Sequence, residues 1–298
     1  MSGMADDLAR RLRALGTSAT AADIQALYAP YIARQPRTGV LVSRDLAYGT
    51  HPGQRLDVYA PEHAAESTAA AIVLLHGGGF IRGDKAQRAN FGYWAARQGF
   101  VAVVANYRLA PAACWPSGPV DVVRIWSWVR ARADHYDIDA ERIVLMGESA
   151  GAAHVAAACL LREHQPRDWQ IRAAVLSSGP YNPQLEARAR TQFGISTPDR
   201  RNDAYYGTDP LTLARANIVE HVDVAPFPVL IGFAERDLLQ MQVQAAELFA
   251  CLVMKHEFAP TLHCFEDHNH YSQAHSYGTS DESVSGPVLD FIRQHTAP

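Results

Sequence analysis

Residues 142–151 read Arg142-Ile143-Val144-Leu145-Met146-Gly147-Glu148-Ser149-Ala150-Gly151 and pass from an apolar run to a segment of small residues. The apolar run is typical of a buried strand, and the segment that follows is typical of a helix. A serine between two glycines at such a junction has the form of a nucleophile elbow, a tight turn that presents the serine hydroxyl. Because Gly-x-Ser-x-Gly also arises by chance, this motif needs support from the rest of the chain.

The composition is that of an ordinary globular protein. The chain has 298 residues, 48% of them hydrophobic and 19% charged, with a formal net charge of −4. No long basic run is present, so we expect no nucleic-acid partner. No stretch approaches the roughly 20 apolar residues of a membrane helix, and residues 1–16 lack the apolar core of a signal peptide. We therefore expect a cytoplasmic protein with no membrane partner, and the sequence leaves a homodimer open.

The four cysteines are Cys114, Cys159, Cys251 and Cys264. They lie far apart without a CxxC spacing, and three of them fall inside helix or strand patterns. We expect buried free thiols rather than disulfides.

Alternating strand and helix patterns predict an α/β fold. Strands are predicted at 40–48, 55–59, 69–75, 100–106, in the run before Gly147, and at 171–177, 228–233 and 261–265; helices are predicted at 88–98, 120–136, 150–164, 238–256 and 284–295. The first two strands, separated by a turn signal, should pair antiparallel. The later strands alternate with helices, which predicts right-handed crossovers and a mostly parallel sheet with helices on both faces.

Two segments stand outside this alternation. Residues 4–34 are predicted to form two helices, the second beginning with a capping box of Thr20 and Asp23, and we treat residues 1–35 as an N-terminal helical cap segment. The sequence does not decide whether they pack on the surface or cover a site. Residues 36–298 form the predicted catalytic domain, interrupted at 179–227 by a long excursion. We expect a small cap-like insertion there, with a mobile surface loop as the alternative.

A glycine triplet follows the strand at 69–75, in the stretch His76-Gly77-Gly78-Gly79-Phe80. Three glycines at a strand end leave backbone N–H groups uncovered, and in an acyl-transfer enzyme such groups build an oxyanion hole. The N–H of Ala150, directly after the serine, would complete it. A phosphate-binding loop is disfavoured because neither a Gly-Lys-Ser/Thr ending nor a GxGxxG spacing is present. A plain turn is the remaining alternative.

The candidate base lies in the cluster Asp267-His268-Asn269-His270-Tyr271, which follows the last predicted strand. Loops at the carboxyl ends of parallel strands carry the sites of such sheets, and the serine turn lies at the same edge. A zinc site formed by His268, His270 and His275 is disfavoured, because no HExxH motif or cysteine partner accompanies them. We therefore predict no metal.

The candidate acid follows the strand at 228–233, in Ala234-Glu235-Arg236-Asp237-Leu238-Leu239. Asp237 is preferred because it stands at the mouth of the loop just before a helix begins, and Glu235 is the alternative. The structural alternative for Asp237 is to cap that helix. The order Ser149, Asp237, His270 is the chain order of the α/β-hydrolases.

With these residues assembled, the chain from about Arg55 to its C-terminus resembles the α/β-hydrolases and is similar to the hormone-sensitive-lipase-like carboxylesterases. The motifs that carry the resemblance are His76-Gly77-Gly78-Gly79-Phe80, Asn106-Tyr107-Arg108-Leu109-Ala110-Pro111 and Gly147-Glu148-Ser149-Ala150-Gly151. The resemblance implies an α/β-hydrolase fold with Ser149 as nucleophile, Asp237 as acid and His270 as base.

The resemblance also assigns the glycine loop. It implies that Gly78 and Gly79 donate to the oxyanion beside Ala150, and that His76 orients the loop. One departure is the ending His268-Asn269-His270-Tyr271-Ser272, which looks closer to small bacterial esterases and to feruloyl-esterase-like and arylformamidase-like relatives. This departure leaves the substrate open and makes His268 a competitor for the base.

We therefore expect a serine hydrolase that cleaves short-chain or aryl carboxylic esters through an acyl-enzyme, with a small-molecule ester as its partner and no cofactor. The candidate substrate pocket consists of Phe80, Tyr107, Tyr181 and Tyr271, which lie near the site loops. The alternative is an aryl or formyl amidase with the same triad. A non-catalytic ligand receptor on this fold is disfavoured, because such receptors usually lack the triad histidine.

Overall fold

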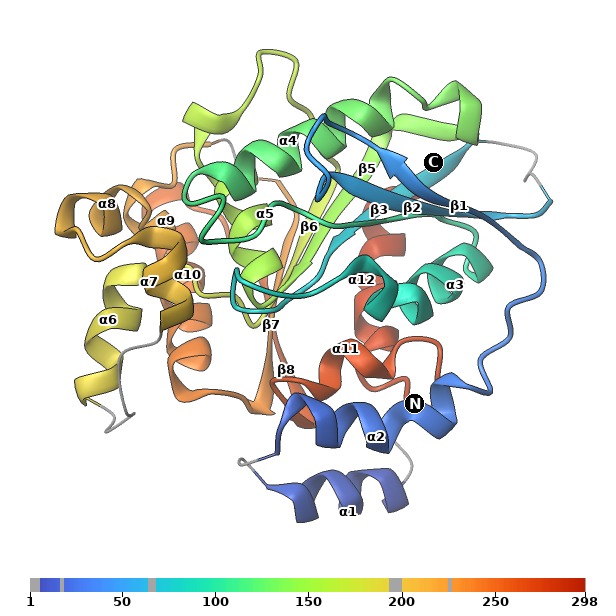
Figure 1. Ribbon diagram of the computed structural model, residues 1–298, viewed down its shortest axis with the longest axis horizontal. Coiled ribbons are helices and arrows are strands. Elements are labelled where there is room, and N and C mark those ends of the chain that lie inside the picture. Colours follow the sequence, from blue (N-terminus) through green and yellow to red (C-terminus); the bar gives the residue numbers. More distant parts are fainter. Residues whose placement is uncertain (1–5, 17–18, 64–67, 193–199, 225–226, 298) are drawn as a thin grey trace.

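The computed structural model describes residues 6–16, 19–63, 68–192, 200–224 and 227–297. Within these residues eight strands form one sheet in the order β1-β2-β4-β3-β5-β6-β7-β8 (Figure 1). The strands are β1 (Val40–Ala47), β2 (Arg55–Pro61), β3 (Ala69–Leu75), β4 (Val101–Ala105), β5 (Ile138–Glu148), β6 (Ala173–Ser177), β7 (Val229–Arg236) and β8 (Thr261–Asn269). β2 pairs antiparallel with β1 and β4, and every other pair is parallel. The predicted mostly parallel sheet is confirmed.

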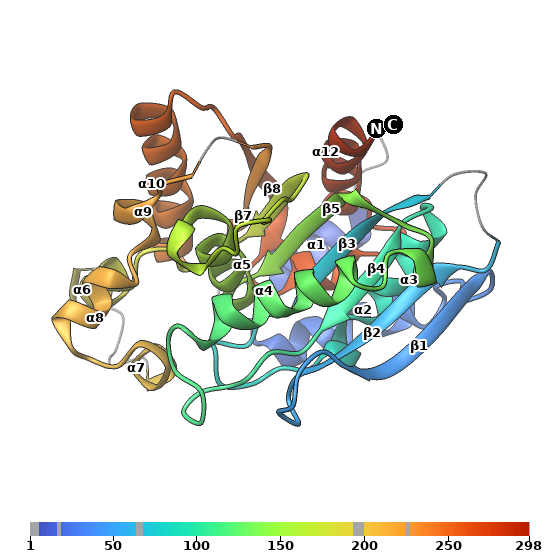
Figure 2. The ribbon, with the colours of Figure 1, turned by 90° about the horizontal axis from the view of Figure 1, so that it is seen from above.

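Helices cover both faces of this sheet, and the side chains of β3 show how. Ile72 and Leu74 belong to one buried cluster with residues of α3 and α12, whereas Val73 and Leu75 belong to another with residues of α4, α5 and α10. Successive side chains of a strand point to opposite faces, so a strand covered on both sides is apolar throughout. Figure 2 shows α4 and α12 on opposite sides of the central strands. These helices are α3 (Ala89–Arg97), α4 (Ser117–Arg130), α5 (Ala150–Leu160), α10 (Leu239–His256) and α12 (Ser285–Thr296).

Two predicted helices are too long, and the sheet is the reason. The helix predicted at 120–136 ends at Arg130, and the chain makes a 3₁₀ turn at Asp134–Tyr136 before β5 begins at Ile138. β5 therefore starts four residues before Arg142, where the apolar run begins, because Ile138 already pairs with Ala69 of β3. The helix predicted at 150–164 likewise ends at Leu160. Tertiary pairing overrides helical periodicity at these ends.

The first two helices are α1 (Asp6–Leu15) and α2 (Ala21–Ile32), and the predicted capping box is present. The Asp23 N–H donates to Thr20 Oγ1 at 3.2 Å, and the Thr20 N–H donates to Asp23 Oδ2 at 2.8 Å. α1 contacts β8, and α2 contacts α11 (Ser272–Ser276), a short helix that the sequence did not predict (Figure 1).

The described part of the excursion at 179–227 is mostly helical. It contains α6 (Pro183–Gln192), α7 (Arg200–Tyr206), α8 (Pro210–Arg215) and α9 (Ile218–His221), whereas residues 193–199 and 225–226 lie outside the described residues. α6 and α9 both contact α10, so this group lies beside the β7 end of the sheet (Figure 1).

The cysteines are free, but the expectation that all are buried is wrong for two of them. Cys159 on α5 and Cys251 on α10 are buried, whereas Cys114 and Cys264 are exposed. Cys264 lies on β8, the last strand of the sheet, where the alternation of side chains turns it outward. Among the described residues, every helix is too short or too polar to cross a membrane.

The buried strand β3 gives a test of the fold. Leu74 is fully buried, so Leu74→Ala should lower the free energy of unfolding by about 2–5 kcal/mol, through lost burial and the cavity left behind. The matched control is Leu41→Ala on β1, where the leucine is 56% exposed, and we expect a change within about 0.5 kcal/mol. Urea unfolding followed by circular dichroism measures both, and equal losses would contradict the assigned core.

Candidate active site

The turn at Ser149 joins β5 to α5. Ser149 has φ 51° and ψ −119°, which non-glycine residues rarely adopt unless neighbouring structure holds them. Its N–H donates to the carbonyl oxygen of Ser177 at 2.8 Å. Gly147 is required here, because a Cβ at that position would lie 2.4 Å from the carbonyl carbon of Gly151. The strand and the helix can therefore approach closely, and the half-buried Ser149 side chain stays accessible.

Three predicted side chains meet at this turn. His270 Nε2 lies 3.0 Å from Ser149 Oγ, and His270 Nδ1 lies 2.7 Å from Asp237 Oδ1. Each of the three is the first residue after a strand: Ser149 follows β5, Asp237 follows β7 and His270 follows β8. Parallel pairing brings these strand ends to one edge, which is why residues far apart in sequence meet there.

Asp237 is held as a carboxylate. Burial alone would raise its pKa, but the charge and hydrogen bond of His270 and the hydrogen bonds from Ser178 and the Ala234 N–H outweigh burial and lower it. An ionised Asp237 accepts the Nδ1–H of His270, which leaves Nε2 free to accept the proton of Ser149. The alternative role as a helix cap is not observed, because the residue at the N-cap of α10 is Leu238.

Several polar residues around Ser149, His270 and Asp237 were not predicted from the sequence. The Ser178 hydroxyl donates to Asp237 Oδ2, and Gln273 Nε2 donates to Ser178 Oγ at 2.6 Å. On the other side, the buried Glu148 accepts a 2.6 Å bond from Arg88 Nε. The only signal that could have found Ser178 is its place as the first residue after β6, between the strands that carry Ser149 and Asp237.

The competing candidates have other partners. His268 is fully buried, its ring nitrogens lie 2.8 Å and 2.7 Å from the hydroxyls of Ser272 and Ser283, and burial lowers its pKa to about 4. Glu235 is exposed and accepts the N–H of Asp267 at 2.7 Å. Among the described residues, no group of three His, Cys, Asp or Glu side chains could hold a metal ion.

The glycine triplet lies against the serine turn. A Cβ on Gly77 would lie 3.1 Å from the Cβ of Ser149. Gly78 has φ 139°, and a Cβ there would lie 1.9 Å from the carbonyl oxygen of Arg82, so only glycine fits. His76 Nδ1 lies 2.7 Å from the Gly77 carbonyl oxygen, and burial lowers the His76 pKa to about 4. His76 is therefore a neutral ring packed under the loop. Gly78 and Gly79 are half-buried, and Ala150 is the first residue of α5.

The four aromatic residues predicted for the pocket have different surroundings. Phe80, Tyr107 and Tyr181 are almost fully buried, so they stand behind the site rather than in an open cavity. Tyr271 is half-buried, and its ring centre lies 5.3 Å from that of His270. Phe80 stacks on Tyr205 of α7 at 4.5 Å and contacts Tyr206 edge-on at 5.2 Å. These two tyrosines, which were not predicted from the sequence, connect the inserted helices to the glycine loop.

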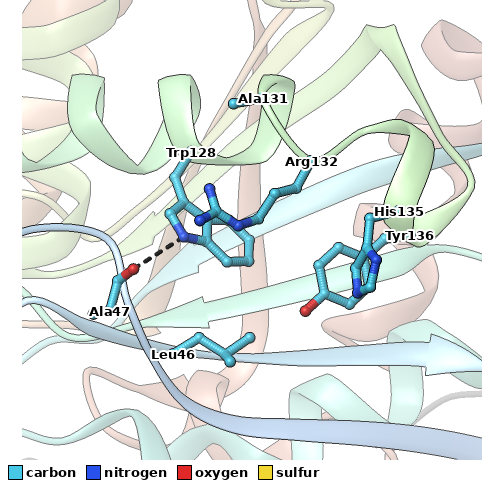
Figure 3. Close-up of a pocket in the computed structure, with 7 residues that line it drawn as sticks. All are labelled: Leu46, Ala47, Trp128, Ala131, Arg132, His135 and Tyr136. Carbon is cyan, nitrogen blue, oxygen red and sulfur yellow. Dashed lines mark hydrogen bonds between the residues drawn. The ribbon is translucent and has the colours of Figure 1, made fainter.

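A cavity of about 640 Å³ lies away from this site, between β1 and the end of α4. Figure 3 shows Arg132 beside the ring of Trp128, whose Nε1 donates to the Ala47 carbonyl oxygen at 3.0 Å. The guanidinium carbon of Arg132 lies 4.4 Å from the centre of that ring. β1 and β8 are the two edge strands of the sheet, so this cavity and the triad lie near opposite edges.

Comparison with known proteins identifies related chains. The family model described as alpha/beta hydrolase fold matches residues 72–273. The acetyl esterase of Salmonella paratyphi B is 32% identical over 139 residues, which cover 46% of this chain and 42% of the relative. The ethyl acetate hydrolase of Pseudomonas putida is 34% identical over 113 residues, which cover 37% of this chain and 36% of the relative. The match therefore spans less than half the length of each of these relatives.

Solved structures share the fold over almost the whole chain. A bacterial heroin esterase superposes with a TM-score of 0.77 at 22% identity, covering 99% of this chain and 98% of the other. Esterase B from Lactobacillus Rhamnosis superposes with a TM-score of 0.75 at 18% identity, covering 97% and 95%.

A buried histidine beside the site predicts acid sensitivity. His154 on α5 is 1% exposed, and burial lowers its pKa to about 3. Between these pKa values His154 binds a proton in the unfolded chain but not in the folded chain. The free energy of unfolding therefore falls as pH drops below the unfolded pKa of about 6.5. Replacing His154 by leucine should make the loss of unfolding free energy less steep, by up to about 1.4 kcal/mol per pH unit between pH 6 and 5. Urea unfolding at several pH values measures this, and parallel curves for wild type and variant would refute it.

Proposed function

The chain belongs to the α/β-hydrolase family, and on this basis we propose that it is a serine hydrolase that cleaves carboxylic esters. The observation that carries the proposal is the unbroken chain from Ser149 Oγ through His270 to Asp237, with distances of 3.0 Å and 2.7 Å. Nucleophile and base within hydrogen-bond reach, with the base oriented by a third group, is the arrangement that activates a serine. The esterase names of the relatives support the same reaction.

In the first half-reaction, Ser149 Oγ forms a bond to the ester carbonyl carbon while His270 Nε2 takes the hydroxyl proton. Asp237 keeps the ring in the Nδ1–H tautomer and stabilises the imidazolium. When the tetrahedral intermediate collapses, the bond from the carbonyl carbon to the alcohol oxygen breaks. The proton on Nε2 then goes to the leaving alcohol, and an acyl-enzyme remains.

The negative charge on the intermediate needs hydrogen-bond donors. We assign this role to the backbone N–H groups of Gly78, Gly79 and Ala150, because the glycine loop packs on the elbow and Ala150 opens a helix. One such donor is worth about 3 kcal/mol of transition-state stabilisation. In the second half-reaction, water gives a proton to His270 and attacks the acyl carbon. Ser149 recovers the proton as the acid leaves.

The surroundings of the serine favour a small acyl group. Phe80, Ala153, Tyr205 and Tyr206 form one buried cluster with Ala150 directly beside the nucleophile. We infer that this cluster fills the space beside the serine and limits the acyl group to a short chain. Relatives named for acetyl and ethyl acetate hydrolysis agree with a short-chain ester, and an aryl alcohol group is the second part of the proposal. We assign the helices α6 to α9 the role of a cap that shapes this pocket.

Other expectations stay predictions. The same triad would hydrolyse an aryl or formyl amide, and a ligand receptor would need no turnover at all. No contact of the described residues favours either function. Cytoplasmic location and a homodimer also stay predictions.

The serine assignment has a direct test. Ser149→Ala should lower kcat for p-nitrophenyl acetate and butyrate by at least about 10⁴-fold, because no nucleophile remains. Circular dichroism and Tm should match wild type, and Ser127→Ala on the exposed face of α4 is the control that keeps activity. Wild type should release a burst of p-nitrophenol, and a p-nitroanilide measured beside the esters separates esterase from amidase. Turnover retained by Ser149→Ala would overturn the proposal.

The same assay distinguishes Asp237 from Glu235 as the acid of the site. Asp237→Asn should lower kcat by roughly 10⁴-fold, because an amide stabilises the wrong tautomer of His270. The control Glu235→Gln changes an exposed carboxylate that bonds only the backbone of Asp267 among the described contacts, and it should change kcat less than about threefold. A larger loss in Glu235→Gln than in Asp237→Asn would move the acid to Glu235.

A further inference from the structure

A second buried polar chain lies beside the triad and begins on the N-terminal helices. Tyr28 of α2 donates its hydroxyl proton to Asp281 Oδ2 at 2.7 Å, and both side chains are fully buried. The Ser283 hydroxyl donates to Asp281 Oδ1 at 2.5 Å. His268 Nε2 lies 2.7 Å from Ser283 Oγ, and His268 Nδ1 lies 2.8 Å from the hydroxyl of Ser272. Five side chains thus link α2 to the segment that contains His270.

The two bonds that Asp281 accepts set the direction of the next bonds in this chain. The carboxylate accepts from Tyr28 and Ser283, so the Ser283 oxygen must accept from His268. His268 then carries a proton on Nε2, and as a neutral ring it accepts at Nδ1 from the Ser272 hydroxyl at 2.8 Å, which also lies 3.3 Å from the Asn269 carbonyl oxygen. Burial lowers the pKa of His268 to about 4, in agreement with a neutral ring. Burial and the Asp281 charge raise the pKa of Tyr28 well above its usual range, so its phenol stays a donor.

The same two helices hold both flanks of His270. Before it, Asp267 has φ 61° and pairs with Arg13 of α1 at 2.7 Å and Arg236 at 3.0 Å. After it, Tyr271 packs against the apolar cluster of α1 and α2, whose members include Leu12 and Ile24. Contacts with α1 and α2 therefore hold residues 267–272 in place. Within this segment, His270 is the residue that contacts Ser149.

We propose that the N-terminal helices position the base of the reaction. Tyr28, Asp281, Ser283 and His268 form the chain that fixes the segment around His270. These four are positioning residues, since none of them touches Ser149. The inference rests on the proposed hydrolase function, and it gives α1 and α2 a role other than a lid over the substrate. Small displacements of a catalytic base lower the reaction rate strongly, since a shift of about 1 Å can lower a rate roughly 100-fold.

The first experiment compares two tyrosines of α2. Tyr28→Phe removes only the hydroxyl that bonds Asp281, and Tyr31→Phe removes the hydroxyl of a half-buried neighbour in the same apolar cluster. We expect Tyr28→Phe to lower kcat for p-nitrophenyl acetate about tenfold with KM within twofold, and Tyr31→Phe to change neither. Rates are taken per active site, counted by titration with a p-nitrophenyl phosphonate that releases one p-nitrophenol per reactive serine, so unfolded protein does not lower them. Equal kcat in Tyr28→Phe and wild type would overturn the inference while leaving the hydrolase proposal intact.

A double-mutant cycle tests whether the groups act in series. Ser283→Ala cuts the chain between Asp281 and His268 at a half-buried residue, and it should lower kcat by a factor similar to that of Tyr28→Phe. If the effect travels along one chain, the double variant loses no more than the worse single variant. Losses that multiply would mean independent structural effects and would refute the chain. A wild type that turns over none of the esters would instead refute the hydrolase proposal.

A measurement on wild type does not depend on the folding of any variant. Long-range ¹H–¹⁵N NMR distinguishes the tautomers of a histidine ring, and His268→Gln identifies the signal. We expect His268 to be neutral at pH 7 with its proton on Nε2. A neutral ring with its proton on Nδ1 would reverse the bond to Ser283, a charged ring would reverse the bond to Ser272, and either result would overturn the chain.

Discussion

Parallel pairing fixes where β5 to β8 end, and the site depends on that constraint. The first residues after these four strands are Ser149, Ser178, Asp237 and His270, in the order in which the strands lie in the sheet. Hydrogen-bonded strands lie only about 4.8 Å apart, so each of these residues lies beside the next, and the His270 side chain crosses the remaining distance to Ser149. This arrangement also stabilises the unusual backbone conformation of Ser149, because the Ser149 N–H is hydrogen-bonded to the end of β6.

The same constraint explains how much the sequence could predict. Strand ends are visible as the point where an apolar run stops, and chemically capable residues at those points are few. Ser149 and Asp237 each stand within a few residues of such a point, so pattern alone suggested them, and the structure brings both to His270. Ser178 occupies the equivalent place after β6 but lies outside every motif, since serine there is an ordinary turn residue.

What escaped prediction is mostly long-range side-chain chemistry. Tyr28 and Asp281 are 253 positions apart, and neither carries a local signal that would pair them. The sequence pattern predicts Tyr28 as one more apolar position of an amphipathic helix, and its ring does lie in the apolar cluster of α1 and α2. The helices at 179–227 were missed for a different reason. α7, α8 and α9 have only four to seven residues each, and helices this short show little periodicity and depend on contacts such as Phe80 with Tyr205.

The choice between His268 and His270 shows the limit of strand periodicity most clearly. Residues two apart on a regular strand share a face, so both rings would be expected to point the same way. Here β8 departs from regular pairing: Phe265 pairs with Ala234 and Asn269 with Arg236, which leaves two extra residues on β8. Asp267 takes up part of this excess with a positive φ. The bulge separates the two histidines. His268 turns into the interior to bond Ser283, and His270, beyond the end of the strand, turns toward Ser149. A bulge has no residue pattern of its own, so only the pairing of β7 with β8 could assign the two rings different roles.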